Sequence, residues 1–234
     1  MAQGKRYRQA RELIKTGQLY SLEEAVKLLQ ETGKVKFDPT AELHINLNVD
    51  PKHPEQLVRG TLVLPHGSGK QIRVAALVTD DKVKAAKAAG ADAAGLEDLI
   101  AEFETGKVNY DVIVAIPDVM KGLGKVAKTL GQKGLMPNLK SGTVTPKFEE
   151  AIRDLKRGKI EFRTDKDGAI HTIFGKLSFK TDQLNNNLTI LLKAIRDAKP
   201  SGIKGNYIKN IHLASTMGPG VQLDVNQVMA ALGR

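Results

Sequence analysis

The chain has 234 residues, 41% hydrophobic and 26% charged, a composition that supports one large globular domain or two smaller ones. Thirty-six Lys and Arg residues against 26 Asp and Glu give a net charge of +10, which favours a phosphate-rich partner, and the lack of cysteine excludes disulfides and thiolate chemistry. The basic N-terminus has no apolar segment of the kind that secretory signals carry, and no apolar run approaches the roughly 20 residues of a membrane span. We expect a cytoplasmic protein without a membrane segment.

The first 65 residues predict one helix and two strands. Ser21 and Glu24 form a capping-box pattern at the start of a helix over residues 21–30, whose apolar residues share one face. Residues 41–49 and 57–65 are β-rich runs joined by a proline-containing loop. Their proximity along the chain predicts an antiparallel pair.

Residues 70–157 have a different pattern, in which predicted strands alternate with predicted helices. Two continuous apolar runs, residues 71–80 and 110–117, have the pattern of buried strands. The intervening and following segments have helical patterns, over residues 81–91, 96–106, 125–134 and 147–158. This alternation predicts a small parallel α/β unit.

After residue 159 a meander of strands returns. Residues 159–163 and 169–175 flank Asp167-Gly168, a sequence that favours a type I′ hairpin turn. A helix over Thr181–Ala198, with five leucine and isoleucine residues along one side, precedes two further strands at residues 206–215 and 220–225. The outer parts could form one α+β domain that the α/β unit interrupts. The alternative is a chain of two ordinary sequential domains, and composition does not decide between the two.

Four local patterns resemble active sites but fit structural roles better. The sequence "GLGKVA" (residues 122–127) matches a dinucleotide fingerprint but lacks the acidic residue expected about 20 positions later. "HGSGKQ" (residues 66–71) fails the phosphate-loop pattern at two positions, and "DKDG" (residues 165–168) fails the calcium-loop pattern. The five histidines lack metal-binding spacing, so we expect no metal and no cofactor; a dinucleotide-dependent enzyme using "GLGKVA" is the alternative hypothesis.

The basic residues are clustered as well as numerous. Between Asp118 and Lys147, six lysines accompany one acidic residue, and Lys121, Lys125 and Lys128 have the spacing of one helical face. The N-terminus adds Lys5, Arg6, Arg8, Arg11 and Lys15. Aromatic residues are only 4%, which disfavours base stacking and favours phosphate and 2′-hydroxyl contacts to folded RNA, although charge alone leaves DNA open.

Four sequence blocks resemble the L1 family of large-subunit ribosomal proteins in its bacterial form. They are "KFDPTAELHINLNVDPKHPEQLVRGTLVLPHGSGK", "PDVMKGLGKVAKTLGQKGLMPNLKSGTVT", "KIEFRTDKDGAIHTIFGK" and "STMGPG". The resemblance implies a discontinuous α+β RNA-binding domain with an antiparallel sheet (residues 1–67 and 159–234), interrupted by a Rossmann-like α/β domain (residues 68–158). The resemblance also implies that the protein is not an enzyme. The partners that it implies are 23S rRNA in the lateral stalk, deacylated tRNA in the exit site, and the mRNA of its own operon. We also expect a monomer outside the ribosome.

The same resemblance implies an RNA-binding surface built from three segments. It comprises Lys36, Phe37, Asp38, Thr40 and Glu42; Arg163, Lys166 and His171; and Thr216, Met217 and Gly218. Auxiliary phosphate contacts are expected from Lys121, Lys125 and Lys133. An apolar Met217 in a Gly-Pro-Gly turn has two interpretations: it belongs to a local core, or it is exposed until RNA covers it.

Overall fold

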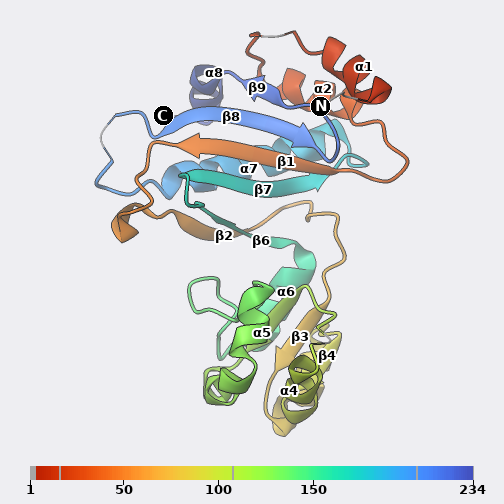
Figure 1. Ribbon diagram of the computed structural model, residues 1–234, viewed down its shortest axis with the longest axis vertical. Coiled ribbons are helices and arrows are strands. Elements are labelled where there is room, and N and C mark those ends of the chain that lie inside the picture. Colours follow the sequence, from red (N-terminus) through yellow and green to blue (C-terminus); the bar gives the residue numbers. More distant parts are fainter. Residues whose placement is uncertain (1–3, 16, 107, 204, 234) are drawn as a thin grey trace. The chain divides into compact units, whose positions relative to one another are not determined.

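The chain forms two compact units, shown in Figure 1. The computed structural model describes residues 4–15, 17–106, 108–203 and 205–233. Unit 1 comprises Met1–Gly69 and Ile160–Arg234, and unit 2 comprises Lys70–Lys159. The predicted fold class is confirmed: strands from both ends of the chain form an antiparallel sheet in unit 1, and the inserted unit 2 contains a parallel sheet with helices.

Unit 1 is organised around a four-stranded antiparallel sheet of order β7-β1-β8-β9. Its strands are β1 (Thr40–Leu47), β7 (Ala169–Lys176), β8 (Ile208–Ser215) and β9 (Val221–Leu223). A separate pair is formed by β2 (Arg59–Val63) and β6 (Lys159–Arg163). The helices are α1 (Lys5–Glu12), α2 (Leu22–Thr32), α7 (Thr181–Asp197) and α8 (Val225–Ala231), with a short 3₁₀ turn at Pro54–Gln56.

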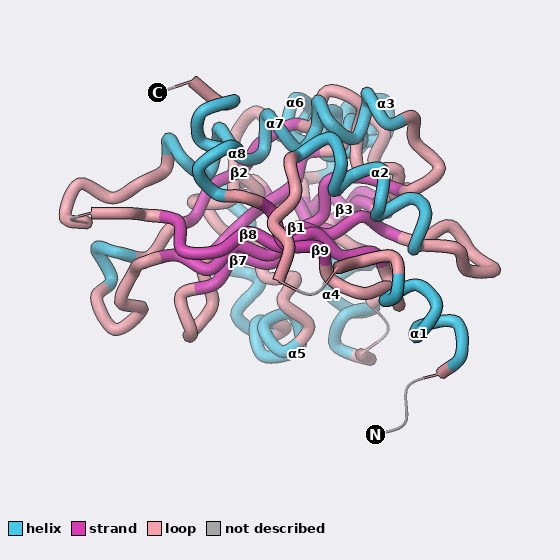
Figure 2. Tube along the Cα trace, turned by 90° about the horizontal axis from the view of Figure 1, so that it is seen from above, coloured by secondary structure: helices cyan, strands magenta, loops and turns pink. Residues whose placement is uncertain are grey.

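The core of unit 1 lies between this sheet and its helices. Figure 2 shows α2, α7 and α8 on one side of the sheet. The alternating burial of β1 sends Leu43 and Ile45 toward this core, where they join the buried leucines of α7. The predicted helix at residues 21–30 is confirmed, and so is its capping box, because Ser21 and Glu24 exchange hydrogen bonds. The predicted apolar side of α7 is also confirmed.

Two predicted local pairings in unit 1 are wrong. Strand β1 does not pair with β2: its neighbours are β7 and β8, which are each eight residues long like β1 itself. The Asp167-Gly168 turn is not type I′, because only Gly168 has positive φ, and β6 and β7 enter different sheets. Instead, Asp165 N donates to Ala169 O (2.8 Å), which closes a three-residue loop with glycine in the left-handed position.

Unit 2 contains a three-stranded parallel sheet of order β4-β3-β5. Its strands are β3 (Val74–Leu77), β4 (Ala93–Gly95) and β5 (Val112–Ala115). Its helices are α3 (Val83–Ala88), α4 (Glu97–Glu104), α5 (Ala127–Gln132) and α6 (Phe148–Arg157), with 3₁₀ segments at Asp80–Lys82 and Pro117–Lys125. The small side chains of β4 gave no strand signal, so this strand was not predicted.

The predicted single helical face of Lys121, Lys125 and Lys128 is wrong. The backbone is a 3₁₀-helix up to Lys125, and α5 begins only at Ala127. With three residues per turn, Lys121 and Lys125 point about 120° apart. Pro117 and the two glycines at 122 and 124 explain the departure, since these residues are poor α-helix formers.

Candidate nucleic-acid interface

The sheet of unit 1 presents polar side chains on the face opposite its helices. Along β1 the residues that alternate with the core are Thr40, Glu42, His44 and Asn46, all at least partly exposed. The register places His44 between His171 of β7 and His212 of β8. This face, which we call the open face, therefore offers hydroxyl, carboxylate and imidazole groups rather than an apolar surface.

At one end of the open face, the predicted segments 36–40 and 216–218 meet. Thr216 N donates to Thr40 O (3.0 Å), and Thr40 N donates back to Thr216 Oγ1 (3.1 Å). Lys176 at the end of β7 completes the cluster, because its Nζ donates to Thr40 Oγ1 (2.9 Å) and to Asp38 O (3.1 Å). We call this cluster the Met217 patch; it consists of Lys36, Phe37, Thr40, Lys176, Thr216, Met217 and Gly218.

The turn between β8 and β9 holds Met217 in an unusual conformation. Among the described residues other than glycine, Met217 alone has positive φ (65°). Arg6 of α1 fixes this turn by donating from Nη2 to Met217 O (2.8 Å), and Gly218 N donates to Ser215 O (2.8 Å). A Cβ at Gly218 would overlap Ser215 Oγ, so any larger residue here would displace the buried Ser215 hydroxyl whether or not RNA approaches.

Two large apolar side chains of the Met217 patch are exposed. Met217 is 68% exposed and Phe37 is 51% exposed. The local-core interpretation of Met217 is therefore wrong. Asp38 differs from its neighbours, because its carboxylate accepts hydrogen bonds from the backbone N–H (3.2 Å) and hydroxyl (2.9 Å) of Ser178 and thereby fixes the start of β1.

The remaining predicted residues of unit 1 lie toward the other end of the sheet. Because β7 runs antiparallel to β1, the 165–169 loop adjoins the Asn46 end, about 20 Å along the strand from Thr40. Arg163 and Lys166 are exposed there, and His171 lies between the two ends. The structure thus spreads the predicted surface along the open face instead of gathering it at Met217.

A row of histidines crosses the middle of the open face. The Nδ1 atoms of His44 and His171 are 2.8 Å apart, so one of them donates to the other, and Glu42 and Asp165 lie 3.6 Å and 3.4 Å from the outer Nε2 atoms. Burial, followed by the charge of His171, lowers the pKa of His44. Burial lowers the pKa of His212. The alternation of β1 could have placed His44 on this face, but sequence gave no signal for its register with His171.

The auxiliary lysines belong to unit 2. Lys121 and Lys125 are exposed, whereas Lys133 donates from Nζ to Gly106 O (3.0 Å) and fixes the end of α4. The glycines of "GLGKVA" lie inside the 3₁₀-helix and do not form a loop at a helix N-terminus, as a dinucleotide site requires. The cavity beyond the carboxyl ends of β3 and β4, where such folds bind ligands, has three acidic lining residues (Asp80, Glu97 and Asp98) against one basic residue (Lys87), and this excess of negative charge disfavours phosphate.

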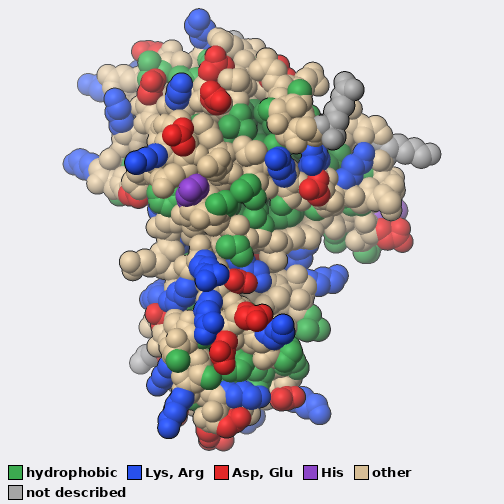
Figure 3. Space-filling model, turned by 180° about the vertical axis from the view of Figure 1, so that it is seen from behind, with side chains coloured by type: hydrophobic (Ala, Val, Ile, Leu, Met, Phe, Trp, Pro, Cys, Tyr) green, Lys and Arg blue, Asp and Glu red, His purple; other side chains and the backbone are tan. Residues whose placement is uncertain are grey.

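Other kinds of site are also missing from the described residues. They contain no group of three or more potential metal ligands in binding geometry, and no helix long and apolar enough to cross a membrane. Figure 3 shows basic and acidic side chains interspersed on the side of unit 1 opposite the view of Figure 1. Because charges of both signs are present, the described residues of that side form no uniformly positive patch that would identify it as the nucleic-acid surface.

An open polar sheet face with exposed apolar and basic side chains at one end favours the class of nucleic-acid-binding proteins. Residues 28–219 match the Ribosomal protein L1p/L10e family, and the chain belongs to this family. It is 47% identical over 228 residues to a large ribosomal subunit protein uL1 of Rickettsia akari, covering 97% of this chain and 95% of that protein. It is 48% identical over 223 residues to the uL1 protein of Saccharopolyspora erythraea, covering 95% and 94%. The chain is a non-enzymatic protein of the large ribosomal subunit.

Proposed function

We propose that unit 1 binds 23S rRNA in the lateral stalk through the Met217 patch and the adjoining open face. The observation that supports this most is the exposure of Phe37, which follows Lys36 in the sequence, and of Met217, on two segments that meet at Thr40 and Thr216 in a chain of net charge +10. Apolar side chains can cover sugar surfaces, and the hydroxyl and carboxylate groups of Thr216 and Glu42 can address 2′-hydroxyls. Residues 165–169 and Arg163 extend this surface, while Lys121 and Lys125 supply auxiliary phosphate contacts from unit 2.

Two further roles use the same surface in this proposal. The protein assists release of deacylated tRNA from the exit site, and it represses translation of its own operon by binding an mRNA fold that resembles the rRNA site. Family membership supports both roles. Outside the ribosome we expect a monomer, which sedimentation of the purified chain tests.

The test is binding of the full chain to a stalk rRNA fragment at fixed salt. Phe37→Ala and Lys36→Gln should each weaken binding by about tenfold, since both remove contacts of the Met217 patch. The matched control is Lys193→Gln on α7, which removes the same charge from an exposed position on the helix side. Equal losses for Lys36→Gln and Lys193→Gln would reject the Met217 patch. A leader of the operon mRNA should compete with rRNA and lose affinity for the same variants.

A further inference from the structure

A cleft lies between α1 and the β8–β9 hairpin of unit 1. Its volume is about 330 Å³, and its polar lining comes from three segments distant in sequence: α1 and the residues after it, β8, and β9. The lining residues with polar side chains are Tyr7, Arg11, Lys15, Gln18, His212 and Gln222. We call this cavity the α1 cleft.

The charges of the α1 cleft are of one sign. Arg11 and Lys15 both line it, and none of its described lining residues is acidic. Neither cation forms an ion pair within the described part of the chain, unlike Arg59 or Lys156, which have carboxylate partners. Two unpaired cations at a concave surface create a positive potential that attracts an anion.

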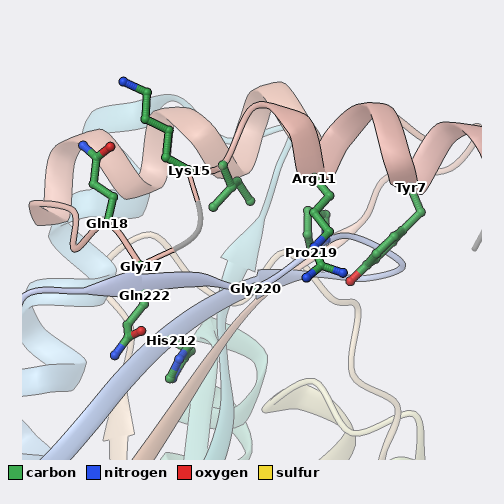
Figure 4. A pocket seen from close by; sticks show the side chains of 10 residues that line it. Tyr7, Arg11, Lys15, Gly17, Gln18, His212, Pro219, Gly220 and Gln222 are labelled. Carbon is green, nitrogen blue, oxygen red and sulfur yellow. The ribbon is translucent and has the colours of Figure 1, made fainter.

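The geometry places donors on both sides of the cleft. Tyr7 and Arg11 are four residues apart and share one face of α1. Figure 4 shows both side chains pointing from α1 toward the Pro219–Gly220 turn, with His212 and Gln222 side by side on the neighbouring strands. The strand register confirms that His212 is opposite Gln222. A guanidinium, an amide and an imidazole suit the several oxygen atoms of a phosphate group.

We propose that the α1 cleft binds a phosphate of the RNA backbone, held by Arg11 from α1 and His212 from β8, while Lys15 at the rim adds positive charge. The proposal rests on the proposed function and extends the RNA surface from the Met217 patch across the edge of β9. It also assigns a role to α1, which already contacts the turn through Arg6. His212 makes the site sensitive to pH, because only its protonated form carries a charge toward the phosphate.

The direction of this pH dependence follows from the surroundings of His212. Burial lowers the pKa of His212 in the free protein, so the ring is neutral at neutral pH. From β1, His212 faces His44, which itself lies next to Glu42 and His171. From the α1 side, the groups that share the cleft with it are Arg11, Lys15 and Tyr7. On β9 its neighbour is the uncharged Gln222. A bound phosphate favours the protonated ring, so RNA binding should take up a proton and strengthen as the pH falls from about 8 to about 6.

The first test compares two arginines of α1. Arg11→Gln should weaken binding to the stalk rRNA fragment by about tenfold and reduce the slope of log affinity against log salt by about one. Arg8→Gln is the matched control, since Arg8 is exposed on the same helix but does not line the α1 cleft. If both variants lose affinity equally, the α1 cleft is not a specific site, although rRNA binding by the wild-type chain still supports the proposed function.

The second test uses His212. The variant His212→Gln should bind more weakly than the wild type and should lose the strengthening of binding toward about pH 6. An unchanged pH dependence would overturn the role of His212. A titration of the full chain with inorganic phosphate, followed by the imidazole NMR signal of His212, separates RNA backbone phosphate from free phosphate as the ligand. A shift without any effect of Arg11→Gln on RNA binding would identify a free-phosphate site and overturn the RNA proposal.

Discussion

Replacing Met217 by glycine should stabilise unit 1 while weakening RNA binding. The left-handed backbone costs a non-glycine residue about 1–2 kcal/mol. Glycine removes this cost but loses about 0.5–1 kcal/mol because its unfolded chain is freer. Since the Met217 side chain is 68% exposed, its deletion sacrifices little apolar burial. The expected net gain in the free energy of unfolding is therefore between about 0 and about 1.5 kcal/mol.

Urea unfolding followed by tyrosine fluorescence measures this change. Tyr7, Tyr20 and Tyr207 belong to unit 1, and only Tyr110 belongs to unit 2, so the signal reports mainly the relevant unit. The same variant should bind the stalk rRNA fragment about tenfold more weakly. Met217→Leu is the control, because it keeps both the backbone strain and an apolar side chain, and it should change neither quantity strongly. A loss of stability in Met217→Gly would refute the reasoning and show that the side chain supports the turn.

Three further predictions concern stability. Asn187 is fully buried, and its side chain forms hydrogen bonds with three backbone groups. The variant Asn187→Ala should therefore lower the free energy of unfolding, measured by chemical denaturation, by about 2–4 kcal/mol. A decrease below about 1 kcal/mol would show that water replaces the amide group. The hydrogen bond from Lys70 and the N–H of Arg73 lower the pKa of Asp111 to about 2; Asp111→Asn should destabilise unit 2 by about 1 kcal/mol at neutral pH. That difference should vanish as the pH falls from about 4 to about 2, and a constant difference would exclude the ion pair as its cause. Because burial lowers the pKa of His44 in the folded state, unit 1 should lose stability as the pH falls through about 6.5, and His44→Gln should reduce that slope.

Patterns along the sequence predicted the elements well where the local signal was strong. The capping box at Ser21 and the leucine side of α7 each depend on residues three or four positions apart, and both are present. The partners of β1 were not predictable in this way. The strand pairs with segments more than 120 residues away, and chain proximity, which favoured β2, does not decide such pairings.

In the candidate site, too, some residues could be predicted from the sequence, whereas others depend on contacts between distant parts of the chain. Thr40, Thr216 and Met217 came from the family resemblance, and the structure brings them together. Lys176 and Arg6 were missed, because their places depend on the β1–β7 register and on how α1 packs against a turn 211 residues away. Long-range packing of this kind leaves no periodic signal in a sequence.

The central position of β1 has a consequence for the synthesis of the protein. Both hydrogen-bonding edges of β1 are filled by strands from the C-terminal half, so β1 in a growing polypeptide cannot complete its pairing until residues 208–215 have been translated. Unit 2 is continuous in sequence, so we expect it to fold earlier, while translation continues. The Met217 patch needs residues 216–218, close to the end of translation. Prematurely terminated chains should therefore lack the RNA affinity that we propose for this patch.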